Sequence, residues 1–196
     1  MITIRRARPS DAAAIGAVHV AAWRSAYPGI LPDDFLATLS PVRQAAHYDH
    51  AIRSGVGVHV ATASGPDLEP QRAGQRSASA GPLVVGFVTG ILARERGAGP
   101  PPAEGEIETL YVLDDWRERG LGRRLMRAAA VQLAAAGCRS AFVWVLRDNP
   151  SRWFYARLGG KPSAEATIQV GGEAVVQTAY VWSPIDTLAQ ATSSAP

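Results

Sequence analysis

Cysteine is almost absent from this sequence of 196 residues, since Cys138 is the only one. A single cysteine excludes an intramolecular disulfide framework and leaves no thiol cluster for zinc. The four histidines show no metal-ligand spacing, so we expect no metal site. Long apolar runs are missing too, because none approaches the roughly 18 residues that cross a bilayer. No signal core follows the N-terminal arginines, and we therefore expect a soluble, cytoplasmic protein that is not bound to a membrane.

Lysine is also scarce, because Lys161 is the only one and the positive charge is otherwise carried by arginine. The formal net charge is +3, and no basic run alternates with aromatic residues, which argues against a nucleic-acid partner. Apolar residues make up 47% of the chain and charged residues 19%, as in an ordinary globular domain. The length fits one domain, which we place at residues 1–185, with a flexible tail over residues 186–196 that frays from about Thr187.

Strand and helix patterns alternate along the chain. Strands are expected over residues 2–8, 56–60, 83–92, 106–113, 140–146, 167–170 and 174–182. Helices are expected from a cap at Ser10 or Asp11 to Ala26, over residues 33–39, 41–54 and 120–136, and from a cap at Asn149 to the glycines at 159–160. This mixture predicts an α+β fold in which helices flank a mixed sheet. The long connections at 64–82 and 93–105 either gate a site or are tolerated insertions.

The start of the helix at residue 120 contains two features that oppose helix stability. Four arginines crowd a helix N-terminus, where each cation costs a few tenths to about 1 kcal/mol. Gly120 and Gly122 each cost about 1 kcal/mol relative to alanine. A bound anion would offset both costs, because it pairs with the arginines and because glycines let it approach free backbone amides. The alternative is a glycine-softened loop with solvated arginines. The arginines concerned are Arg117, Arg119, Arg123 and Arg124.

The strand before this turn contains a slip in its apolar alternation. Ile107 shares its parity with Thr109, whereas Leu110 and Val112 have the opposite parity. If Ile107, Leu110 and Val112 all face one core, an extra residue must form a bulge near Thr109. A strand buried on both faces explains the same pattern without a bulge.

Two segments carry a resemblance to a known family. Arg117-x-x-Gly120-x-Gly122, after the strand Ile-Glu-Thr-Leu-Tyr-Val, resembles the acetyl-CoA motif of the GNAT superfamily of N-acetyltransferases. The segment Asn-Pro-Ser-Arg-Trp-Phe-Tyr-Ala-Arg-Leu-Gly, residues 149–159, is similar to the next signature of that family. The resemblance covers about residues 2–182. It implies the acyl-CoA N-acyltransferase fold, with a central, mostly antiparallel sheet of about seven strands that is splayed in the middle.

The resemblance also implies a cosubstrate and the residues that hold it. Acetyl-CoA would enter the splay, with its pyrophosphate on the turn and its pantetheine arm along the bulged strand, while Asn149 reaches the arm from the far side. No metal takes part, and homodimers are common in the family. The residues expected to bind acetyl-CoA are Leu110, Tyr111, Val112, Arg117, Arg119, Gly120, Leu121, Gly122, Arg123, Asn149 and Arg152.

Acyl transfer from a thioester to an amine requires a base for the amine and an acid for the leaving thiol. Glu106 matches the position of the catalytic glutamate in some members of the family, and Glu108 is the other carboxylate near the expected cleft. Tyr155 matches the usual general acid, and a phenol with an ordinary pKa near 10 is protonated at neutral pH. The alternatives are two surface glutamates and a packed aromatic ring.

Trp23 and Tyr27 lie four residues apart on one helix face and resemble the acceptor wall of many bacterial members. They could hold an amine by cation–π contact, or they could fill the core instead. We therefore expect an N-acetyltransferase that acts by direct attack of a primary amine, in a small molecule or a peptide, with Glu106 as base and Tyr155 as acid. The alternative function is a nonenzymatic module that binds or senses acyl-CoA on the same fold.

Overall fold

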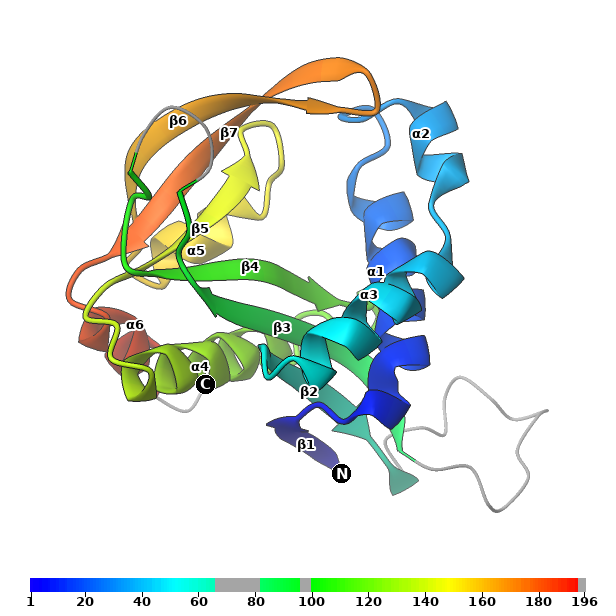
Figure 1. The fold of residues 1–196 in the computed structure, drawn as a ribbon, viewed down its shortest axis with the longest axis horizontal. Helices are drawn as coiled ribbons and strands as arrows, with labels where there is room; N and C mark the ends of the chain where they lie inside the picture. The colour runs from blue at the N-terminus through cyan, green and yellow to red at the C-terminus, as the bar shows by residue number, and fades with distance from the viewer. Residues whose placement is uncertain (66–81, 96–99, 194–196) are drawn as a thin grey trace.

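The computed structural model describes residues 1–65, 82–95 and 100–193 (Figure 1). The central parts of the two long connections, expected at 64–82 and 93–105, lie outside these residues. The strands are β1 (Ile2–Arg6), β2 (Gly57–Ala63), β3 (Leu83–Leu92), β4 (Gly105–Val112), β5 (Ala141–Leu146), β6 (Lys161–Val170) and β7 (Glu173–Trp182). The helices are α1 (Ala12–Ala26), α2 (Asp33–Thr38), α3 (Pro41–Arg53), α4 (Leu121–Ala135), α5 (Arg152–Arg157) and α6 (Asp186–Ala191), with short 3-10 helices η1 (Pro9–Asp11) and η3 (Asp114–Trp116).

The seven strands form one sheet in the order β1-β2-β3-β4-β5-β7-β6. Neighbouring strands of this sheet are antiparallel, except that β4 and β5 run parallel. These two strands pair only at Gly105 with Ala141 and at Glu106 with Phe142. Beyond these pairs the two strands diverge (Figure 1). The predicted α+β fold, a mostly antiparallel mixed sheet that is splayed in the middle and flanked by helices, is confirmed.

The bulge in β4 is present, and its extra residue is Glu108. Thr89 of β3 pairs with Thr109, but the next residue, Gly90, pairs with Ile107, so the register passes over Glu108. Beyond the bulge, Leu110 packs against the same buried cluster as Ile107. The strand therefore changes the phase of its alternation at one point instead of burying both faces along its whole length.

Two hydrophobic cores lie on the two faces of the sheet. The first contains Leu125 and Leu133 of α4 and Leu188 of α6. The second contains Ile15 of α1 and Tyr48 of α3. Figure 1 shows α4 on one face of the sheet and α1 and α3 on the other. Each helix therefore covers the sheet with one apolar stripe, as expected for an amphipathic helix.

Three local expectations differ from the structure. Asp11 stands at the N-cap position of α1, but its side chain does not cap the helix; the carboxylate accepts hydrogen bonds from the guanidinium of Arg5 (2.7 and 2.8 Å) and the backbone amide of Arg8 (2.7 Å). Asn149 precedes α5 by a turn, because the helix begins at Arg152. The tail expected to fray from Thr187 forms α6 up to Ala191, because Leu188 buries its side chain in the first core.

The hairpin of β6 and β7 reaches over to α2 at its tip (Figure 1). Gly171 at this tip has φ +59°, and a Cβ atom there would lie 2.6 Å from Cγ of Phe35. Only glycine permits this approach. Within the described ranges, no helix is long and apolar enough to cross a bilayer.

Candidate active site

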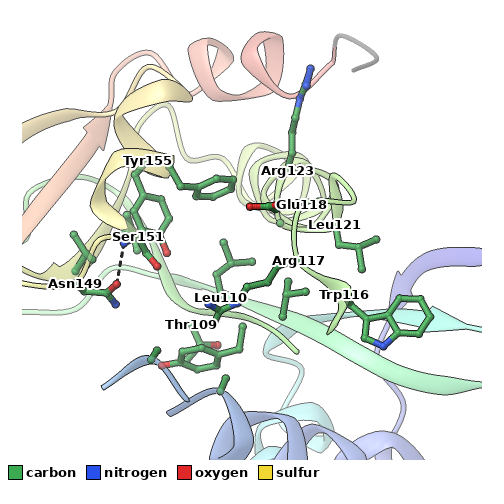
Figure 2. Close-up of a pocket in the computed structure, with 18 of the residues that line it drawn as sticks. Thr109, Leu110, Trp116, Arg117, Glu118, Leu121, Arg123, Asn149, Ser151 and Tyr155 are labelled. Carbon is green, nitrogen blue, oxygen red and sulfur yellow. Dashed lines mark hydrogen bonds between the residues drawn. The ribbon is translucent and has the colours of Figure 1, made fainter. Parts of the chain in front are cut away.

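A cleft of about 440 Å³ opens where β4 separates from β5. Its walls come from β4, the end of β5, α5, the start of α4 and the end of α1. Figure 2 shows Asn149, Ser151 and Tyr155 on one side of this cleft and Trp116 and Leu121 on the other, with Thr109 and Leu110 between them. The splay therefore joins the two sequence signatures in one cavity.

The glycine-rich turn forms one end of the cleft. Gly120 has φ +72° and stands immediately before α4, where it offers no side chain to the first free amides of the helix. Glu118 also has positive φ, at +59°, which is uncommon for a residue with a side chain. A Cβ at Gly122 would lie 3.3 Å from Cζ of Phe154. The turn thus exposes backbone amides at a helix N-terminus, which is the geometry that binds anions.

The arginines of this turn differ in position. Arg117 and Arg123 line the cleft, and Arg117 also forms an exposed ion pair with Asp114 at 2.8 Å. Arg119 does not line the cleft, and its guanidinium lies 4.8 Å from the centre of the Trp116 ring. Arg152 is outside as well: it donates to the carbonyl of Arg147 at 2.6 Å.

The other residues expected to contact acetyl-CoA lie along the cleft. They are Leu110, Tyr111, Val112, Gly120, Leu121, Gly122 and Asn149. The Oδ1 of Asn149 accepts a hydrogen bond from the amide of Ser151 at 2.8 Å, drawn as a dashed line in Figure 2. This bond fixes the amide orientation and leaves the NH2 group as a donor.

Tyr155 projects from α5 into the cleft, although only 6% of its surface is exposed. Burial raises the pKa of its phenol, and Tyr27 nearby raises it further. Burial also raises the pKa of Tyr27, which hydrogen bonding by Asn149 opposes. Tyr155 is therefore a neutral hydroxyl donor throughout the physiological range.

The two glutamates of β4 have different surroundings. Glu106 is 4% exposed, pairs in register with Phe142 and does not line the cleft. Glu108, the bulge residue, is exposed and lines the cleft. Glu108 follows Glu106 after a single residue, yet one carboxylate is buried and the other faces the cavity.

The two residues expected to form the acceptor wall lie in different surroundings. Tyr27 lines the cleft, whereas Trp23 lies outside it in an aromatic cluster. The Trp23 ring stacks on His19 at 5.3 Å and meets Tyr27 at 4.9 Å and Phe35 at 6.3 Å, measured between ring centres. Trp23 therefore packs against the ring of Tyr27 from outside the cleft.

Several residues that line the cleft were not predicted from the sequence. Trp116 is buried beside the turn, and Phe154 lies against Gly122. Trp116 directly precedes the first signature and Phe154 lies within the second, so their positions were a usable signal. Thr109 and Glu118 carry no comparable signal, because the bulge and the positive φ decide where they point. In the part of the chain that the structure describes, no group of three His, Cys, Asp or Glu residues could hold a metal ion.

Comparisons with known proteins give one consistent family. The model of the Acetyltransferase (GNAT) family matches residues 69–160. The uncharacterized N-acetyltransferase YuaI of Bacillus subtilis is 29% identical over 188 residues, 96% of each chain. The fold is similar to that of a GCN5-related N-acetyltransferase from Rhodopseudomonas palustris (TM-score 0.65, 22% identity, 92% of this chain and 94% of that one). It is also similar to YncA, a putative acetyltransferase from Salmonella typhimurium solved with acetyl-CoA (TM-score 0.62, 18% identity, 93% of each chain).

Proposed function

We propose that this chain, which is similar to the GNAT superfamily in its motifs, sequence and fold, transfers an acetyl group from acetyl-CoA to a primary amine. The acceptor is a small molecule or a peptide, and the amine attacks the thioester directly. One observation carries the proposal: the cleft between β4 and β5 brings the glycine turn, Tyr155 and Glu108 to the same cavity.

The residues present fit acetyl-CoA. The pyrophosphate would lie on the amides that follow Gly120, with Arg117 beside it. The pantetheine arm would lie along Leu110 and Val112, where β4 has separated from β5 and its backbone groups are not used by that neighbour. The similarity to a structure solved with acetyl-CoA supports this donor.

Tyr155 is the proposed general acid. Because burial keeps its phenol neutral, it can donate a proton to the thiolate that leaves as the tetrahedral intermediate collapses. The products are the acetylated amine and the free thiol of CoA. This assignment needs no covalent acyl-enzyme intermediate.

The proposed general base is a carboxylate of β4. The sequence favoured Glu106, but its burial at the point where β4 and β5 pair leaves Glu108 as the carboxylate that meets an amine in the cleft. Glu106 would need an intervening water molecule to reach the same proton. We therefore assign the base to Glu108 in preference to Glu106.

Two measurements test the function. Calorimetry with acetyl-CoA and then with CoA should show saturable binding, and both ligands should raise the melting temperature. A screen for release of the CoA thiol across amines, aminoglycosides, amino acids and peptides then separates an enzyme from a nonenzymatic acyl-CoA module. Absence of acetyl-CoA binding contradicts both functions, and binding without thiol release for any acceptor favours the module.

A further inference from the structure

The bulge at Glu108 stands where the cleft begins, and a network of buried polar side chains lies beside it. Thr109, the residue after the bulge, donates from Oγ1 to Oγ1 of Thr89 at 2.8 Å across the ladder. Thr89 and Thr109 are the last pair in register before the shift. This side-chain bond therefore ties β4 to β3 at the residue where the strand leaves its regular path.

The network of polar side chains continues into the helices on the far face of the sheet. Burial raises the pKa of the Tyr48 phenol on α3, and the neighbouring side chain of Thr109 opposes this rise. The Tyr48 hydroxyl also lies 2.8 Å from Nδ1 of His19 on α1. Tyr48 and Thr89 are each 2% exposed and His19 is 8% exposed. Two helices and two strands thus meet through four side chains at the bulge.

These polar groups are unusual for their surroundings. The Tyr48 ring packs against Phe87 with ring centres 4.9 Å apart, so phenylalanine would fill the same space without burying a hydroxyl. A buried polar group costs free energy when unpaired, and a satisfied network restricts the core to one arrangement. Burial lowers the pKa of His19 to about 4, with His47 contributing, so the imidazole stays neutral beside the phenol.

A second register shift in the sheet provides a contrast. It lies between Ala61 and Thr62 in the ladder of β2 and β3, away from the cleft. Thr62 is buried there like Thr89, but its hydroxyl reaches only the carbonyl of Thr3, at 3.5 Å. A bulge in this sheet therefore does not require a side-chain network, and the one beside the cleft has one.

We propose that the hydroxyl of Thr89, bonded to Thr109 and backed by Tyr48 and His19, is a positioning group that holds the β4 bulge in place and keeps the cleft open. The network acts through Thr109, which lines the cleft, and sets the direction in which Glu108 leaves the strand. Tyr48 itself does not line the cleft and touches no reacting atom. The consequence for acetyl-CoA rests on the function proposed above, whereas the effect on the bulge does not.

The test uses four variants and two measurements. Tyr48→Phe and Thr89→Val each remove one hydroxyl from the network, and Thr62→Val removes a buried hydroxyl at the register shift between β2 and β3. Hydrogen exchange of residues 105–112 reports the bulge, and calorimetry reports acetyl-CoA affinity. We expect the first two variants to exchange faster in this segment and to bind acetyl-CoA about tenfold more weakly, the effect of one lost buried hydrogen bond. Thr62→Val should change neither, and Thr89→Ser, which keeps the hydroxyl, should behave like the wild type.

Unchanged exchange and affinity in both Tyr48→Phe and Thr89→Val would overturn the proposal, as would an equal loss in Thr62→Val. If Tyr48→Phe does not fold, the comparison of Thr89→Val with Thr89→Ser decides. If the wild type binds no acetyl-CoA, the proposed function fails, and hydrogen exchange alone decides whether the network holds the bulge.

Discussion

Glu106 and Phe142 are the last residues that pair between β4 and β5 before the two strands separate. The pairing holds Glu106 in the sheet, where only 4% of its surface is exposed. Glu108 follows after a single residue but faces the cleft, because the bulge changes the direction of β4. Position in the strand, and not distance along the sequence, therefore separates the two candidate bases.

The first prediction concerns these two carboxylates. Glu108→Gln should lower kcat/KM for acetyl transfer by about 10²-fold or more, the usual contribution of a general base, with little change in acetyl-CoA affinity. Glu106→Gln should lower kcat/KM less, because its side chain does not line the cleft. Steady-state kinetics with an acceptor from the thiol-release screen measures both. The opposite ranking would return the role of base to Glu106.

The second prediction concerns Tyr155. Tyr155→Phe keeps the ring beside Tyr180 and Trp182, with centres at 6.3 and 6.4 Å, and removes only the hydroxyl. We expect kcat to fall by about 10²-fold or more while the Kd for acetyl-CoA changes little, because a general acid acts in the transition state. Single-turnover rates and calorimetry together test this. A variant with wild-type turnover would remove Tyr155 from the mechanism.

The third prediction concerns the glycine turn. Gly122→Leu should raise helix stability by about 1 kcal/mol or less and yet weaken acetyl-CoA binding, because its side chain would enter the cleft against Phe154. Calorimetry and thermal unfolding measure the two effects separately. Ala134→Leu, at an exposed position of the same helix, is the matched control and should leave affinity unchanged. Equal affinity in Gly122→Leu would contradict the position assigned to the pyrophosphate.

The fourth prediction concerns the arginines. Arg117→Glu should weaken acetyl-CoA binding more than Arg119→Glu, because Arg117 lines the cleft while Arg119 lies over Trp116. The loss of the exposed pair with Asp114 should matter little, since such pairs contribute about 0–1 kcal/mol. Arg127→Glu, on the exposed surface of α4, controls for net charge. The difference from the wild type should shrink in high salt, which screens charges. A greater loss of affinity in Arg119→Glu than in Arg117→Glu would contradict the placement of Arg117 beside the pyrophosphate.

The sequence was most informative where the signal is local. The glycine turn and the signature beginning at Asn149 are each contained in a few consecutive residues, and both lie on the cleft. The phase slip in residues 106–112 allowed a bulge, but only the register of β3 against β4 shows that Glu108 is the extra residue. The choice between Glu106 and Glu108, and the contact of Tyr48 with His19, depend on segments far apart in the chain. Such contacts follow from tertiary packing and have no local pattern.

The same limit explains α6. Residues 186–191 have few strong helix signals, and the sequence suggested a frayed end. The helix is stabilised because Leu188 is fully buried in the core beside α4. Tertiary packing thus outweighs weak local propensity, as is usual for short helices.

The last prediction concerns His19 and acid stability. Burial lowers its pKa in the folded protein to about 4, from an ordinary value near 6.5. Between these values the unfolded chain binds a proton that the folded chain does not, so the contribution of His19 to stability falls as the pH falls. The loss between pH 7 and pH 5 should be about 2 kcal/mol. Urea unfolding at the two pH values measures it.

A neutral replacement isolates this contribution. His19→Gln cannot take up a proton in this range and can still hydrogen bond to Tyr48, so its stability should fall by about 2 kcal/mol less than that of the wild type. His59, whose pKa burial also lowers, contributes to both proteins and cancels in the comparison. His50→Gln, at an exposed position on α3, should keep the pH dependence of the wild type. Parallel pH dependence of the wild type and His19→Gln would mean that the imidazole of His19 takes up its proton in the folded protein as readily as in the unfolded chain.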